Sequence, residues 1–210
     1  MDERSLLIRK MESGLILKSF SIKEALGAVD RKDFVLPKYV DYAYVDRPLP
    51  IGEGQTISQP STVVFMLELL QVEKGHRVLD GGSGSGWTTA LLSHLVGPTG
   101  EVVAMELLPS LKIFGENNFH KTGRQNAVFI RGNAAKGYAP KAPFDRILIS
   151  AGATEVPAAL LSQLAIGGKL VIPLQDAQGN LLLVEKLGEH SYQKSYYPGF
   201  AFVPFVDNPG

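Results

Sequence analysis

The 210-residue sequence contains no cysteine and has no excess of charge of either sign. The absence of cysteine excludes disulfide bonds, thiolate metal sites and cysteine nucleophiles together. Twenty-one basic residues balance twenty-one acidic ones, so nothing in the composition indicates a nucleic-acid footprint or attraction to an anionic membrane surface. Any chemistry must therefore come from other side chains.

The sequence also has no apolar run that approaches the length of a membrane span, and its charged start, Met1 to Arg4, lacks the apolar core of a secretory signal. We therefore expect a cytoplasmic protein that acts as a monomer, without a membrane or a nucleic acid as partner. The histidines have no metal-ligand spacing, so no metal site is expected. They are His76, His94, His120 and His190.

With 45% hydrophobic residues the chain can bury a sizeable core, and a single domain over residues 1–210 is predicted. Residues 1–33 show helical spacing and form a helical preamble. Residues 34–60 lose this periodicity and are punctuated by prolines and glycines, which predicts an irregular loop of the kind that often carries function. Residues 61–210 are predicted to form a cofactor-binding α/β core.

Strands and helices alternate from residue 77 onward, which is typical of a parallel, doubly wound sheet. The predicted strands cover residues 77–81, 101–106, 127–131, 145–150 and 169–174. The predicted helices cover residues 86–96, 109–122 and 157–165. A turn at residues 176–179, followed by an apolar run at 181–187, predicts an antiparallel hairpin, and a final strand is expected near residues 200–206.

A glycine-rich segment directly follows the first of these strands. The run Arg77 to Asp80 leads into Gly81-Gly82-Ser83-Gly84-Ser85-Gly86 and then into a helical pattern that begins at Trp87. Glycines let the backbone approach a ligand without an intervening Cβ, and the helix offers its unpaired N–H groups. The segment is therefore typical of a nucleotide-binding loop.

The glycine spacing argues against two common phosphate-binding loops. A dinucleotide fingerprint that begins at Gly82 needs a third glycine at position 87, where the chain has Trp87. Gly81 and Gly86 have the separation of a P-loop, but no lysine follows them. Alternate glycines after the acidic Asp80 suit a nucleoside that carries an amino acid, a description that fits S-adenosyl-L-methionine.

A second acidic residue supports this interpretation. Glu106 ends the next predicted strand, where a carboxylate can accept hydrogen bonds from both ribose hydroxyls. The alternative is a surface turn with an incidental glutamate. Because ligands of open α/β sheets bind at the carboxyl ends of the strands, residues 150–152 should join the same crevice and the loop around residues 44–60 should cover it. The predicted cofactor-binding residues are Asp80, Gly82, Ser83, Gly84, Ser85, Gly86, Glu106, Leu107, Gly132 and Asn133.

The irregular loop carries a longer motif. Residues 44–60 read YVDRPLPIGEGQTISQP, which resembles the signature of protein-L-isoaspartate (D-aspartate) O-methyltransferases. Further segments resemble the family in the same order along the chain. They are Val78–Gly86, Ala142–Ile147, Val156-Pro157, Gly167–Pro173 and Phe202–Phe205. The resemblance covers nearly the whole chain.

The resemblance implies the Rossmann-like fold of S-adenosylmethionine-dependent methyltransferases and a repair reaction. The methyl group would pass to the free α-carboxylate of an isoaspartyl residue in a damaged protein or peptide, with S-adenosyl-L-homocysteine as product. In the family the Thr-Ile-Ser segment lines the acceptor site, which points to Ser58 as the residue that orients this carboxylate, with Thr56 beside it. A turn-capping or helix-capping Ser58 is the alternative. Asp46 is expected to brace the loop at least as readily as it touches substrate.

Several positions depart from the family pattern. Asn133 replaces an aspartate expected to accept from the adenine amino group, Gln175 replaces a glycine near the acceptor end of the sheet, Asp80 replaces a glutamate and Trp87 a tyrosine. These departures leave two alternatives open. One is a diverged methyltransferase of the same fold that acts on another carboxylate or hydroxyl group. The other is a non-catalytic nucleoside-binding module.

Overall fold

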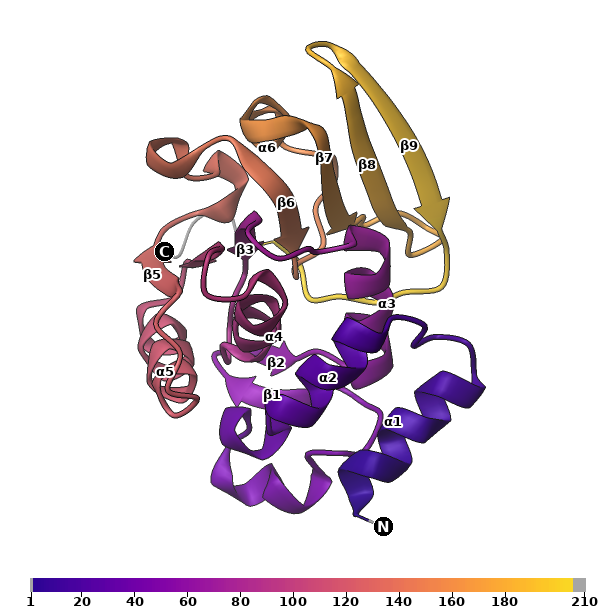
Figure 1. The fold of residues 1–210 in the computed structure, drawn as a ribbon, viewed down its shortest axis with the longest axis vertical. Helices are drawn as coiled ribbons and strands as arrows, with labels where there is room; N and C mark the ends of the chain where they lie inside the picture. The colour runs from indigo at the N-terminus through magenta and orange to yellow at the C-terminus, as the bar shows by residue number, and fades with distance from the viewer. Residues whose placement is uncertain (1, 206–210) are drawn as a thin grey trace.

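A computed structural model describes residues 2–205, and a seven-stranded sheet with the order β5-β4-β3-β6-β7-β8-β9 forms its centre (Figure 1). Strands β3 to β7 run parallel, whereas β8 and β9 are antiparallel to their neighbours. The prediction of a doubly wound, mostly parallel sheet with an antiparallel hairpin is therefore confirmed. The strands are β3 (Arg77–Gly81), β4 (Glu101–Glu106), β5 (Ala127–Arg131), β6 (Phe144–Ile149), β7 (Leu164–Pro173), β8 (Leu181–Gly188) and β9 (Ser191–Tyr197).

The central strands are apolar along their length because both faces of the sheet are covered. Val78 and Val102 point into the core on one face, and Leu79 and Val103 point into the core on the other; all four are fully buried. This arrangement explains why these strands appear in the sequence as continuous aliphatic runs.

Helices cover the two faces unequally (Figure 1). The larger group belongs to the core on the face that contains Val78, although its first two helices pack on the other helices rather than on the strands. Among the helices of residues 2–205, only α6 and the short 3₁₀ helix η3 contribute to the core on the face that contains Leu79. The first group is α1 (Glu3–Ser13), α2 (Phe20–Ala28), α3 (Pro60–Leu70), α4 (Trp87–Val96) and α5 (Pro109–His120). The second is η3 (Ala134–Lys136) and α6 (Ala158–Gln163), with η4 (Ala139–Lys141) in the same crossover.

The segment predicted to be an irregular loop contains regular structure. Two 3₁₀ helices, η1 (Arg31–Phe34) and η2 (Pro37–Tyr42), precede a two-stranded antiparallel sheet formed by β1 (Leu49–Gly52) and β2 (Gln55–Ile57). The prediction was wrong here because these strands are very short. Three consecutive residues at the tip, Gly52, Glu53 and Gly54, have φ values of 102°, 52° and 69°, which reverses the chain within a tight turn.

The strand predicted near residues 200–206 is also wrong. The last strand is β9, which pairs with β8 along the outer edge of the sheet. The later segment makes a single isolated bridge, between Pro204 and Gly152, and proline has no N–H with which to continue a ladder. Residue 206 lies outside the described residues.

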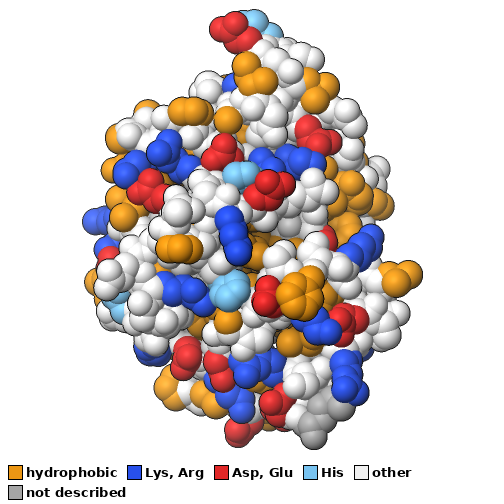
Figure 2. All heavy atoms as spheres, viewed as in Figure 1, with side chains coloured by type: hydrophobic (Ala, Val, Ile, Leu, Met, Phe, Trp, Pro, Cys, Tyr) orange, Lys and Arg blue, Asp and Glu red, His pale blue; other side chains and the backbone are white. Residues whose placement is uncertain are grey.

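The outer surface agrees with the balanced composition. On the face shown in Figure 2, basic and acidic side chains are interspersed rather than gathered by sign. Within residues 2–205, no helix is both long and apolar enough to cross a membrane.

Candidate active site

A cavity lies at the carboxyl ends of β3, β4, β5 and β6, beside the position where the strand order reverses. The structure brings most of the predicted site residues together there. Those that line it are Thr56, Ser58, Gly82, Ser83, Gly84, Ser85, Glu106, Leu107, Gly132 and Asn133. All of the predicted site residues lie in the described part of the chain. Two of them, Asp80 and Gly86, do not line the cavity.

The glycine loop between β3 and α4 is held in place by its own backbone. The N–H groups of Gly82 and Ser83 both donate to the Met105 carbonyl, at 2.9 and 3.1 Å. Gly86 has a φ of 82°, and a Cβ at this position would lie 2.5 Å from the Gly115 carbonyl oxygen on α5. Gly86 is therefore needed for the close packing of the loop on α5 rather than for a wall of the cavity.

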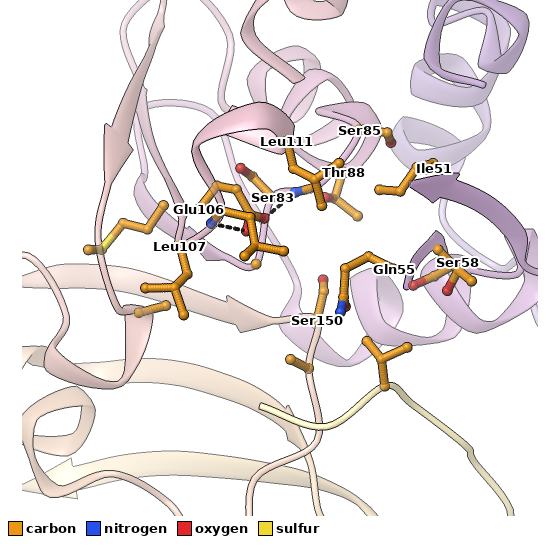
Figure 3. A pocket seen from close by; sticks show the side chains of 18 of the residues that line it. Ile51, Gln55, Ser58, Ser83, Ser85, Thr88, Glu106, Leu107, Leu111 and Ser150 are labelled. Carbon is orange, nitrogen blue, oxygen red and sulfur yellow. Dashed lines mark hydrogen bonds between the residues drawn. The ribbon is translucent and has the colours of Figure 1, made fainter. Parts of the chain in front are cut away.

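Glu106 connects the glycine loop to the cavity. Its Oε2 accepts a hydrogen bond from the Gly84 N–H at 2.9 Å, and its Oε1 accepts one from the Leu108 N–H at 3.0 Å (Figure 3). A carboxylate has about four acceptor positions, so two remain for a ligand. The side chain is buried and is thus fixed before any ligand arrives.

Asp80 lies beneath the loop and is fully buried. Its Oδ2 accepts hydrogen bonds from the Thr89 hydroxyl at 2.6 Å and from the Thr88 hydroxyl at 3.1 Å. Burial raises the pKa of Asp80 to about 6, although the two threonine hydrogen bonds oppose the shift. Thr88 itself lines the cavity, so in this arrangement Asp80 reaches the cavity through that hydroxyl. Direct binding of a cofactor by Asp80 stays a prediction.

Two buried polar atoms in the cavity wall have no hydrogen-bond partner among the described residues. They are Ser83 Oγ and Trp87 Nε1, on side chains that are only 3% and 2% exposed. Buried polar atoms are nearly always paired, so these two atoms call for a polar ligand or ordered water in the cavity. The tryptophan that departs from the family pattern thus adds a donor to the wall.

The β1–β2 hairpin forms the opposite wall. In Figure 3, Ile51, Gln55 and Ser58 face Glu106 and Leu107 across the cavity. Ser150, which directly follows β6, also lines the cavity. The C-terminal segment lines a further side. Its lining residues are Val203, Pro204 and Phe205.

The loop that carries the hairpin is braced by a hydrogen bond from α3 to Asp46. Asp46 Oδ1 accepts a hydrogen bond from the Ser61 N–H at 2.9 Å, in the first turn of α3. This contact is the bracing role expected for Asp46. Ser58 is not the N-cap of α3, because Gln59 occupies that position. The helix-capping alternative for Ser58 therefore has no support in the structure.

The two remaining departures from the family pattern, Asn133 and Gln175, also have clear positions. Asn133 lies in the cavity wall, and its Oδ1 accepts a hydrogen bond from the Ala135 N–H at 2.8 Å. Gln175 is exposed and does not line the cavity formed by residues 2–205; its N–H donates to the Ala153 carbonyl at 2.8 Å. The substitution of glutamine for glycine at position 175 therefore does not change the wall of this cavity.

Sequence reasoning did not select several residues that line the cavity. Trp87, Thr88 and Leu111 belong to the first turns of α4 and α5, directly after the loops that follow β3 and β4. Their position in the sequence could have identified them, since the first helical turn after a loop at the carboxyl end of a strand faces the ligand-binding crevice. Among the described residues, no group of three or more histidine or acidic side chains could hold a metal ion.

Comparison with known proteins connects this geometry to a family. The model of the protein-L-isoaspartate (D-aspartate) O-methyltransferase family matches residues 2–210. The chain belongs to this family. A protein-L-isoaspartate O-methyltransferase of Methanopyrus kandleri is 44% identical over 99% of this chain and 92% of its own length, and one of Thermococcus sibiricus is 43% identical over 100% and 99%.

A solved structure resembles the whole fold of this family member. It is described as a Plasmodium falciparum protein-L-isoaspartate O-methyltransferase in complex with S-adenosyl-L-homocysteine. It has a TM-score of 0.88 and 25% sequence identity, and the match covers 99% of this chain and 100% of the other. The family match includes both walls of the cavity, the signature segment and the glycine loop.

Proposed function

We propose that this protein transfers a methyl group from S-adenosyl-L-methionine to the free α-carboxylate of L-isoaspartyl residues in damaged proteins and peptides, and so initiates their repair. The observation that carries the proposal is the meeting, in one cavity, of the signature residues Thr56 and Ser58 with the glycine loop and Glu106. The family match over residues 2–210 supports it.

The donor side of the cavity suits an adenosyl amino acid. Glu106 would accept from ribose hydroxyls, and Asn133 would face the adenine. The unpartnered Ser83 Oγ and Trp87 Nε1 fit the polar groups of the methionine end. When bound, S-adenosyl-L-methionine supplies a methyl group activated by a sulfonium. No phosphate has to be neutralised, which agrees with a loop that lacks lysine.

The acceptor side needs to position its substrate more than to activate it. A carboxylate is already ionised at neutral pH, so the reaction needs no general base. The Ser58 hydroxyl would donate a hydrogen bond to the acceptor carboxylate, with Thr56 beside it, and so hold one oxygen in line with the methyl group. Orientation of this kind can contribute about 7–11 kcal/mol to lowering a barrier.

Selectivity for isoaspartate would come from the path of the substrate backbone. The isomer adds one methylene to the chain and presents a free carboxylate where an ordinary peptide has an amide. The hairpin and the segment from Val203 to Phe205 together form the walls that such a substrate would meet. An aspartyl peptide would leave the polar groups of the pocket unpaired, which disfavours it.

We further propose that the enzyme acts as a monomer on polypeptide substrates, without nucleic acid or membrane as partner. On the face shown in Figure 2 the charges are interspersed and form no broad field of one sign, which supports the part of the proposal that concerns nucleic acid and membranes. The cytoplasmic location stays a prediction.

A methyl-transfer assay tests the proposal directly. Wild-type protein should methylate an isoaspartyl peptide and leave the aspartyl version of the same peptide unmodified. Ser58→Ala should lower kcat substantially and barely change binding of S-adenosyl-L-homocysteine, since the hydroxyl acts on the acceptor. Ser162→Ala, an exposed serine on α6, is the matched control and should retain full activity. Protein that binds the donor product but leaves isoaspartyl peptides unmethylated would contradict the proposal.

A further inference from the structure

Arg31 is a fully buried arginine in η1, 1% exposed, far from the glycine loop in the sequence. Its guanidinium lies 4.7 Å from the centre of the Trp87 ring, in a cation–π contact with a residue of the cavity wall. Its Nη2 donates to the Ser58 carbonyl at 2.7 Å, and its Nη1 donates to the Ala43 carbonyl at 2.9 Å. One side chain thus touches residues of both the donor and the acceptor walls.

The hydrogen bond to Ser58 matters because the hairpin does not hold this residue. The β1–β2 ladder ends at the pair Leu49 and Ile57, and α3 begins only at Pro60. Ser58 lies in the gap between the two elements. The bond from Arg31 therefore fixes a backbone group that neither the strand ladder nor the helix holds.

The chemistry of the contact requires an arginine. A guanidinium is a planar fork that can donate to two carbonyls in different directions while its face lies against an aromatic ring. Among the described residues no carboxylate forms an ion pair with Arg31, and burial lowers the pKa of its guanidinium to about 10, so it remains charged at neutral pH. The charge of Asp46 favours the charged guanidinium without an ion pair, and the buried Arg31 Nε has no hydrogen-bond partner among the described residues. A buried charge with so few direct partners is costly for a contact that merely joins loops.

We propose that Arg31 is a positioning residue that aligns Ser58 with the acceptor carboxylate while its guanidinium packs on Trp87 of the donor wall. This inference rests on the proposed function of Ser58. Lysine can replace the charge but cannot donate to both carbonyls from one plane. Arg31→Lys should therefore lower kcat with isoaspartyl peptide about tenfold, and it should leave the affinity for S-adenosyl-L-homocysteine within threefold of wild type.

A double-mutant cycle separates this role from a structural one. If Arg31 acts through Ser58, Arg31→Lys should lower kcat about tenfold in the wild-type background and less than twofold in the Ser58→Ala background. A merely structural loss would lower kcat by the same factor in both. Arg146 is the matched control, because it is also a buried arginine that donates to two carbonyls, those of Gln71 and Asp145, at the opposite end of the sheet. Arg146→Lys should leave kcat unchanged.

The outcomes are distinguishable. If Ser58→Ala retains full activity, the proposed role of Ser58 fails first. If Ser58→Ala is impaired but the effects of the two substitutions multiply, or Arg31→Lys retains wild-type kcat, only the role of Arg31 is overturned. Should Arg31→Lys not fold, a measurement on wild-type protein decides instead. The arginine Nε–H resonances in donor-product-saturated enzyme should include one that shifts with isoaspartyl peptide and not with aspartyl peptide, and the absence of such a shift overturns the inference.

Discussion

The carboxyl group of Asp80 should make the stability of this protein fall as pH rises from about 4 to about 6. Burial raises its pKa from 3.8 to about 6, so the folded protein holds this proton more tightly than the unfolded chain does. The stabilising contribution is complete below the unfolded pKa and is lost as pH rises through the folded one. A shift of about two units, at roughly 1.4 kcal/mol per unit, corresponds to about 3 kcal/mol.

Asp80→Asn isolates this contribution, because asparagine has nearly the same size and keeps an acceptor for the Thr89 hydroxyl. Urea unfolding of both proteins at pH 4, 5, 6 and 7 gives two curves of unfolding free energy against pH. We expect the variant to gain about 3 kcal/mol relative to wild type between pH 4 and pH 7. Other titrating groups cancel in this difference.

An exposed aspartate gives a control of opposite sign. Hydrogen bonds from the side chain and backbone of Asn180 lower the pKa of Asp176. Asp176→Asn should therefore remove a contribution that is present at neutral pH and is lost as pH falls. Parallel curves for wild type and Asp80→Asn would refute the reasoning, since they would mean that the buried carboxyl does not change its proton affinity on folding.

Three further substitutions, one of them with a matched control, test the site and the packing of its loop. Glu106→Ala should weaken binding of S-adenosyl-L-homocysteine by about 1–3 kcal/mol, or roughly five- to hundredfold, and unchanged affinity by calorimetry in a folded variant would remove Glu106 from the donor site. Asn133→Asp should leave that affinity unchanged or tighten it, because a carboxylate oxygen can still accept from the Ala135 N–H; a marked loss would show that the amide acts as a donor. Gly115→Ala places a Cβ 2.5 Å from the Gly84 carbonyl oxygen and should destabilise the fold by about 1–3 kcal/mol, whereas Gly27→Ala, with nothing within 4 Å, should be neutral or stabilising; equal urea midpoints would contradict the packing.

The parallel core could be predicted closely because its strands are buried on both faces. β3, β4 and β5 have the predicted bounds, since Val78-Leu79 and Val102-Val103 give unbroken aliphatic runs that end at polar or glycine residues. β9 was missed for the opposite reason. Its seven residues, Ser191–Tyr197, lie on the outer edge and are largely polar, so neither alternation nor an apolar run distinguishes them from a loop.

The site residues likewise fall into two groups, those that could be predicted from the sequence and those that could not. Residues whose role depends on the local chain path, such as the glycines after β3 and the acid at the end of β4, could be located from spacing alone. Arg31 could not, because its contacts with Ala43, Ser58 and Trp87 join parts of the chain that only tertiary packing brings together. The position of Asp80 beneath the loop likewise depends on which face of β3 the helices cover.

The short β1–β2 hairpin has a consequence for the order of events on the enzyme. Only three residue pairs join its strands, with a register shift, whereas the opposite wall grows out of the seven-stranded sheet. Local unfolding takes less free energy where fewer backbone hydrogen bonds must break. We therefore expect amide protons of Gln55 and Thr56 to exchange with solvent sooner than those of Leu79 and Val103. Faster exchange there would mean that the hairpin wall opens while the sheet stays folded, which would admit a bulky polypeptide to a cavity in which the donor is already bound.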